Sequence, residues 1–229
     1  MADQAALHMR HAEVVFLASY LNSLTEWDAR AAVRIVQRDR VVGFFGAPPT
    51  GCITFIAVPL SSAGEEQEVV HSRTVSAGRM RDVLGDVSLP PRGFAGRRLR
   101  VPDPVTGPLE LLTLPPLSGW ERTESTTAEA LGPLVEEALG EFRRRVPQDA
   151  NIEAAAAQRV AEEIWSRPAL GDVPVRAVHT AHRLGFLNKD TATVDAAQVP
   201  GWTRLATPSG QVFTALGTSN LTLGSVTGR

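Results

Sequence analysis

The residues best suited to chemistry in this sequence are arginines concentrated in one stretch. Residues 71–100 contain seven arginines and two aspartates, a net charge of +5, while the whole chain carries −2 and the remainder therefore −7. Arg92, Arg97, Arg98 and Arg100 occur within nine residues that hold no acid. Guanidinium groups bind phosphate and carboxylate, so this segment is a candidate site for nucleic acid or another anion. The alternative is that these arginines pair with carboxylates elsewhere in the fold or on a sister subunit.

A second candidate lies in the C-terminal half. Residues 152–216 have the order helix, helix, hairpin, which is the outline of a winged helix-turn-helix. The helix expected over 174–187 carries Arg176 and Arg183 on its outward side, and these side chains could contact phosphates or base edges. The alternative is that the helix pair and the hairpin cover the first sheet.

No complete catalytic, metal or cofactor motif is present. The sequence has no G-x-G-x-x-G, no P-loop and no G-x-S-x-G. His8 and His11, like His179 and His182, are spaced i, i+3 but lack a third ligand nearby. The single cysteine, Cys52, lies in an apolar run and is expected to be buried. We therefore expect no catalytic residues, no metal and no cofactor.

Composition indicates an ordinary globular protein. Of 229 residues, 43% are hydrophobic and 21% charged, and one cysteine excludes an internal disulfide. No secretory signal is visible, and the apolar run near the N-terminus is far shorter than the roughly 20 residues of a membrane-spanning helix. These features predict a cytoplasmic protein without membrane contact. Arginine supplies 22 of the 23 basic residues, which points to a high-GC bacterial genome.

The apolar stretch 31–60 predicts the centre of the fold. Its alternation and turn residues indicate strands over 32–37, 41–45 and 52–60, joined as an antiparallel meander. The third of these strands is apolar on both faces and needs cover on both, so a face left open would be a partner interface. The fold class we expect is α+β, an antiparallel sheet covered by helices and ending in a helix-helix-hairpin.

The other expected elements divide the chain into two halves. Helices are expected over 5–24, 132–146, 152–166 and 174–187, with the first helix covering part of the second sheet face. A hairpin is expected over 202–216, a second hairpin or wide loop around 99–114, and loops over 188–200 and the tail 217–229. A boundary within 115–127 predicts a β-rich half, 1–120, and a helical half, 121–229, packed as one unit or as two subdomains.

The function remains unassigned at the level of motifs, and three classes are open. The absence of catalytic motifs favours a non-enzymatic binding or assembly protein acting through a protein partner or a homo-oligomer. The second class is a nucleic-acid-binding or regulatory protein that uses the arginines of 71–100 or the helix 174–187. The third is an enzyme with a scattered site, for which the candidates are His71, Arg73 and Arg79.

Overall fold

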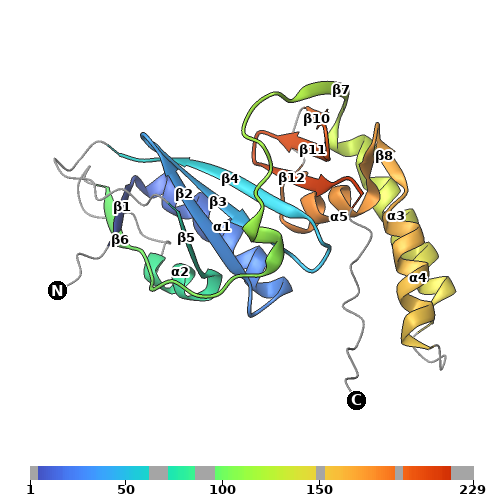
Figure 1. The fold of residues 1–229 in the computed structure, drawn as a ribbon, viewed down its shortest axis with the longest axis horizontal. Helices are drawn as coiled ribbons and strands as arrows, with labels where there is room; N and C mark the ends of the chain where they lie inside the picture. The colour runs from blue at the N-terminus through green and yellow to red at the C-terminus, as the bar shows by residue number, and fades with distance from the viewer. Residues whose placement is uncertain (1–4, 62–71, 86–95, 148–152, 189–192, 218–229) are drawn as a thin grey trace, which may run out of the picture.

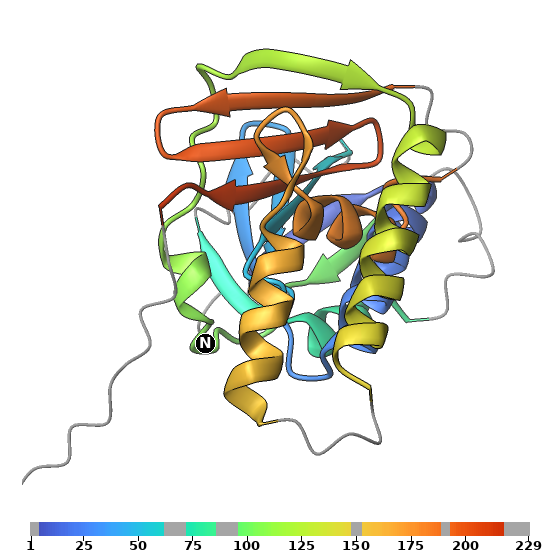
Figure 2. The ribbon, with the colours of Figure 1, turned by 90° about the vertical axis from the view of Figure 1, so that its right-hand side faces the viewer.

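The computed structural model describes residues 5–61, 72–85, 96–147, 153–188 and 193–217. Its centre is one antiparallel sheet of eight strands in the order β5-β2-β3-β4-β12-β11-β10-β7. Five helices lie on one face of this sheet (Figures 1 and 2). The α+β class predicted from the sequence is confirmed, and so is the meander at its centre.

The first half of the sheet contains the meander and an edge strand. Its strands are β2 (Ala32–Arg38), β3 (Val41–Gly46), β4 (Ile53–Pro59) and β5 (Arg73–Ser76). Helices α1 (His11–Trp27) and α2 (Ala77–Leu84) cover one face of these strands. A separate ribbon of β1 (Ala6–Met9) and β6 (Arg97–Arg100) lies beside them.

The second half repeats this arrangement with different helices. Its strands are β7 (Glu121–Thr126), β10 (Val194–Val199), β11 (Trp202–Thr207) and β12 (Gly210–Ala215). The helices are α3 (Ala128–Arg145), α4 (Ala154–Trp165) and α5 (Val175–Arg183), with a small hairpin of β8 (Pro168–Leu170) and β9 (Val173–Pro174) between the last two. β12 pairs with β4, which makes the sheet continuous.

Two sequence-based expectations are wrong, and the alternatives of a third are narrowed to one, each for a reason outside local propensity. Residues 6–9 form β1 instead of the first helical turn, because they pair with β6 some ninety positions away. Of the hairpin or wide loop expected around 99–114, the hairpin does not form, since β6 takes β1 as its partner and 109–112 make a 3₁₀ turn, η1 (Leu109–Leu112). The expected loop 188–200 contains β10, which pairs with β7. The boundary within 115–127 stays a prediction, and β7 lies in that stretch.

The placement of the N-terminal helix is also different from expectation. α1 packs on the same sheet face as α5, because its Tyr20 ring stacks on Phe186 beside α5, with ring centroids 6.1 Å apart. The Tyr20 hydroxyl lies 2.7 Å from the Thr54 hydroxyl on β4, inside the core. Burial of this phenol raises the pKa of Tyr20, so the group stays neutral. Within the described residues, the opposite face of the sheet therefore carries no α-helix.

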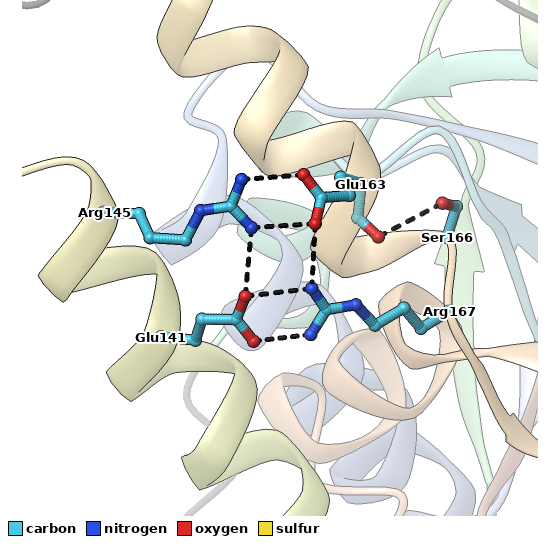
Figure 3. Close-up of polar contacts among 5 residues, drawn as sticks. All are labelled: Glu141, Arg145, Glu163, Ser166 and Arg167. Carbon is cyan, nitrogen blue, oxygen red and sulfur yellow. Dashed lines mark hydrogen bonds and ion pairs between the residues drawn. The ribbon is translucent and has the colours of Figure 1, made fainter.

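The helices α3 and α4 are joined by a ring of four alternating charges (Figure 3). Arg145 contacts both Glu141 and Glu163, at 3.0 and 2.7 Å, and Arg167 contacts the same two carboxylates. The two arginines are bound through both arms of the guanidinium group, which is the strong form of this contact. The ring fixes α3 against α4 at the right-hand end of Figure 1.

Hydrogen bonds from these arginines lower the pKa of Glu141 and of Glu163 to about 2. Their pKa is depressed in the folded state, so the ring stabilises the protein above pH 4.5 and this stabilisation is lost as the pH falls toward 2. We expect the carboxyl carbons of both residues to titrate near pH 2 by NMR at low salt, and at higher pH in 1 M NaCl because salt screens exposed charges. Midpoints near 4.5 at low salt would contradict the ring.

Two glycines lie in contrasting surroundings, one tightly packed and one open. A Cβ at Gly210 would lie 2.5 Å from the Phe186 ring, whereas a Cβ at Gly132 in α3 would meet nothing within 4 Å. We expect Gly210→Ala to lower the free energy of unfolding by about 1–3 kcal/mol, through overpacking. Gly132→Ala should raise it by about 0.5–1 kcal/mol, because alanine loses less entropy in a helix. Urea denaturation of both variants measures this, and equal effects would contradict the packing.

Candidate functional site

The sheet face opposite the helices carries a small aromatic cluster. Phe45, Ile53 and Phe213, from β3, β4 and β12, are buried there together with Leu111. Phe55 packs on Phe45 with ring centroids 4.6 Å apart. Because strand side chains alternate, these residues point away from the helix-covered core that holds their neighbours Phe44, Thr54 and Val212. The second core therefore lies directly over the joint between the two halves.

One extended segment covers this cluster. The crossing segment, defined here as residues 101–120, runs from β6 to β7 through η1 (Figure 1, green). Arg34 on β2 holds it by donating to the Leu111 carbonyl at 2.6 Å. The Val105 amide donates to the Thr74 carbonyl at 2.9 Å, and the Trp120 indole N–H to the Pro116 carbonyl at 2.9 Å. The segment is thus fixed by backbone contacts and by one buried leucine.

The rest of the crossing segment leaves leucines in solvent. Leu109, Leu112 and Leu117 are 73%, 68% and 54% exposed, within nine residues of each other. Leu111 in the same 3₁₀ turn is 1% exposed, because it is the side chain that faces the sheet. Burying one exposed leucine on a partner would contribute about 1.5–3 kcal/mol. Of these three leucines, Leu117 also lines the groove described next.

A groove lies between the crossing segment and the sheet. Its volume is about 150 Å³. The first half of the sheet and the second half both contribute walls, and the crossing segment closes one side. The lining residues are Phe45, Phe55, Pro115, Pro116, Leu117, Trp120, Arg204, Gln211 and Phe213. We call this site the linker groove.

Arg204 is the charged group of the linker groove. Its guanidinium lies over the Trp120 ring, 4.8 Å from the ring centroid. Its Nε is buried and has no hydrogen-bond partner within the described part of the chain. Burial lowers the pKa of Arg204, and attraction to Asp195 offsets this only in part. A buried guanidinium N–H without an acceptor is costly, so a ligand that brings a carboxylate or carbonyl oxygen would be favoured here.

The sequence did not reveal this site. The sequence predicts a strand of the hairpin 202–216 for Arg204, and a hairpin or wide loop for 99–114. The available signal was the leucine spacing: Leu111 and Leu112 are adjacent, which breaks the alternation of a half-buried strand. Two residues that line the groove, Phe55 and Arg204, are about 150 positions apart in the sequence. The pairing of β4 with β12 brings their strands into one sheet.

The arginines singled out from the sequence do not form one cluster. Arg92 lies outside the described residues, and Arg97, Arg98 and Arg100 are on β6. Arg176 and Arg183 are on α5, on the other side of Figure 1. Arg176 is ion-paired with Glu162 at 2.5 Å, and the Arg183 guanidinium lies 5.9 Å from the Trp27 ring centroid. Anion or nucleic-acid binding by these six residues stays a prediction.

One of the two histidines of α5, His179, lies in the interior of the helix layer, whereas His182 is exposed. His179 packs between Trp27 of α1 and Trp165 of α4, with ring centroids 5.6 and 5.0 Å away. No group of three or more potential metal ligands occurs in the parts of the chain that the structure describes. Cys52 is buried, as expected, and burial raises the pKa of its thiol. Among the described helices, none is long and apolar enough to cross a membrane.

Burial lowers the pKa of His179, and the nearby charges of His182 and Arg183 lower it further. The unfolded chain therefore binds this proton more readily, so stability falls as the pH drops below about 6.5. We expect His179→Phe to flatten the dependence of the urea midpoint on pH between 5 and 7.5. A variant with the wild-type slope would contradict the burial of the imidazole between the two indoles.

Comparison with solved structures identifies the fold class. The chain resembles the DNA polymerase sliding clamp of Bacillus subtilis with a TM-score of 0.52 and 14% identity, over 95% of this chain and 66% of the clamp subunit. It resembles the Caulobacter crescentus clamp with a TM-score of 0.50 and 12% identity, over 98% and 69%. The DNA polymerase III subunit beta of Pseudomonas aeruginosa gives 0.52 and 12%, over 92% and 64%. The chain thus has a sliding-clamp-like fold and spans about two thirds of these subunits.

Sequence comparison reaches a shorter part of the chain. Residues 115–218 match a family model described as a domain of unknown function, DUF8185. This match begins inside the crossing segment and contains the whole second half of the sheet. A search of curated protein sequences found no match.

Proposed function

We propose that this protein is a non-enzymatic binding protein that captures an extended segment of a protein partner in the linker groove. The proposal rests on two features that occur together: the exposed leucines of the crossing segment, and the Nε of Arg204, which has no hydrogen-bond partner within the described residues. Together they match a segment with an apolar side chain next to a carboxylate. The clamp-like fold supports a binding role, since the solved structures that share it are subunits of DNA polymerase assemblies.

The distribution of charge favours a protein partner over nucleic acid at the helix layer. The five helices together carry nine carboxylates and eight arginines. The solvent-facing side of α1 holds Val15, Phe16 and Glu26 but no basic residue. Duplex DNA is held mainly by many basic contacts to phosphate, and this layer does not offer them. A nucleic-acid-binding role, like a cytoplasmic location, stays a prediction from the sequence.

The volume of the groove favours binding of a partner protein over self-association. The groove volume of about 150 Å³ is below the roughly 300–1,000 Å³ of pockets that enclose a whole small-molecule ligand. That volume suits one anchor residue from an extended peptide. The partner class is therefore a protein with an accessible linear segment, and a second copy of this chain is the competing outcome.

The test begins with a displayed peptide library selected on the purified full chain. We expect the selected peptides to share an aliphatic or aromatic residue within two positions of an aspartate or glutamate. Leu117→Asp should weaken their binding by more than about tenfold, because it places a charge in the apolar wall. Arg204→Gln should weaken carboxylate-containing peptides by about tenfold and leave their amide analogues unchanged.

Leu134→Asp is the matched control, because Leu134 is an exposed leucine on α3, in the helix layer. It should leave peptide affinity within about twofold of the wild type. The proposal would be overturned if the selected peptides lacked an acidic residue. It would also be overturned if Leu117→Asp and Leu134→Asp weakened peptide binding equally. A solution mass of twice 24.6 kDa that Leu117→Asp returns to the monomer would show that the groove binds a second copy instead.

A further inference from the structure

The outer edge of β6 presents unpaired backbone groups. The Val101 amide donates to the Ala5 carbonyl at 2.8 Å, and β6 runs antiparallel to β1 from there. Hydrogen-bonded pairs alternate along an antiparallel ladder, so Leu99 bonds to β1 and the N–H and C=O groups of Arg98 and Arg100 point outward. The opposite edge of the ribbon is closed, because the His8 carbonyl accepts from the Ser61 amide at 2.8 Å. Among the residues that the structure describes, none pairs with the outer edge of β6, so the ribbon has one open edge there.

The same two residues also place positive charge at this edge. The side chains of Arg98 and Arg100 are exposed and lie on the outer face of the ribbon, while Leu99 between them is buried. Neither guanidinium makes an ion pair or a hydrogen bond within the described residues. Residues two apart on a strand are about 6.6 Å apart on one face. The edge of β6 thus offers the backbone N–H and C=O groups of Arg98 and Arg100 together with their two positively charged side chains, which are spaced like alternate residues of a strand.

The edges of the main sheet do not share this combination. At β5, the Thr74 carbonyl is already occupied by the Val105 amide. At β7, the register shifts opposite Ala196 and Ala197, and the strand carries charges of both signs. Glu124 of β7 also accepts from the Gly171 amide at 2.7 Å. Bulges and charged side chains both protect an edge from strand addition. β6 has no bulge and its charges are all positive, so its protection fails only against a strand of opposite charge.

We propose that the β6 edge binds an extended acidic segment of a partner protein by strand addition. The added strand exchanges backbone hydrogen bonds with Arg98 and Arg100. It places two carboxylates, two residues apart, opposite the two guanidinium groups. Cross-strand pairs of opposite charge stabilise a sheet, and like charges directly opposite each other destabilise it. The two arginines thus admit acidic strands and exclude basic ones, and this surface is separate from the linker groove.

The probe is a labelled nine-residue peptide with glutamate at every second position and threonine between. Fluorescence anisotropy with the full chain at low salt should show binding that the glutamine analogue loses by about tenfold or more. Methylating the peptide nitrogens that face β6 should cost a similar factor, because it removes backbone donors. Arg98→Glu combined with Arg100→Glu should abolish the binding.

Arg143→Glu combined with Arg144→Glu is the control, since these are two adjacent exposed arginines at the end of α3. It should leave binding within about twofold. If the R98E/R100E chain melts below the wild type, the R98Q/R100Q chain replaces it. Equal affinity for the glutamate and glutamine peptides overturns the proposal, as does indifference to N-methylation. Binding of a duplex oligonucleotide that requires Arg98 and Arg100, without peptide binding, also overturns it.

Discussion

The structure depends on the short pairing between β4 and β12. Three residue pairs, from Gln211 and Phe55 to Phe213 and Ile53, convert two four-stranded sheets into one of eight. Buried contacts support this joint from the helix side, where Tyr20 bonds to Thr54 and its ring stacks on Phe186. Phe186 in turn fits against Gly210 at the start of β12, where no side chain would have room. The joint is thus tightly packed on one face.

On the other face, the described residues that cover this joint are those of the crossing segment, which contains no strand paired with the sheet. The crossing segment is fixed by Arg34 and by Leu111, and it leaves a groove beside Trp120 and Arg204. This groove lies near the midpoint of the chain, on the sheet face opposite the five helices. The helices carry nearly balanced charge, and the proposed binding surface lies on the strand side of the molecule.

Much of the fold was predictable because local patterns and tertiary contacts agree there. The alternation at Ala32–Arg38 and the Pro-Gly turn at 48–51 predicted the meander, and the apolar stripe through Val135 and Ala138 predicted α3. The sequence also predicted that an open face of the third strand would be an interface. β1, β7 and β10 were missed because their pairing is non-local. β7 is exposed along nearly its whole length and has no apolar alternation to detect.

The groove itself could not be predicted, because it depends on where distant chains meet. Arginine content pointed to residues 71–100 and to α5. The buried Nε of Arg176 and that of Arg204 both lack a hydrogen-bond partner within the described residues, but Arg176 is ion-paired with Glu162 on a neighbouring helix. In a chain with 22 arginines, residue type alone does not distinguish them. The arginines are distinguished by the burial and the surroundings of each guanidinium group.

The four tryptophans offer the most direct measurement of where a partner binds. Trp120 lines the linker groove and Trp202 packs in the same cluster, whereas Trp27 and Trp165 flank His179 in the helix layer. Fluorine NMR of the chain labelled with 5-fluorotryptophan gives one assignable signal for each, and a library-selected peptide can be titrated in. Binding in the groove predicts shifts of Trp120 and Trp202 with Trp27 and Trp165 unchanged. Shifts confined to Trp27 and Trp165 would contradict the account.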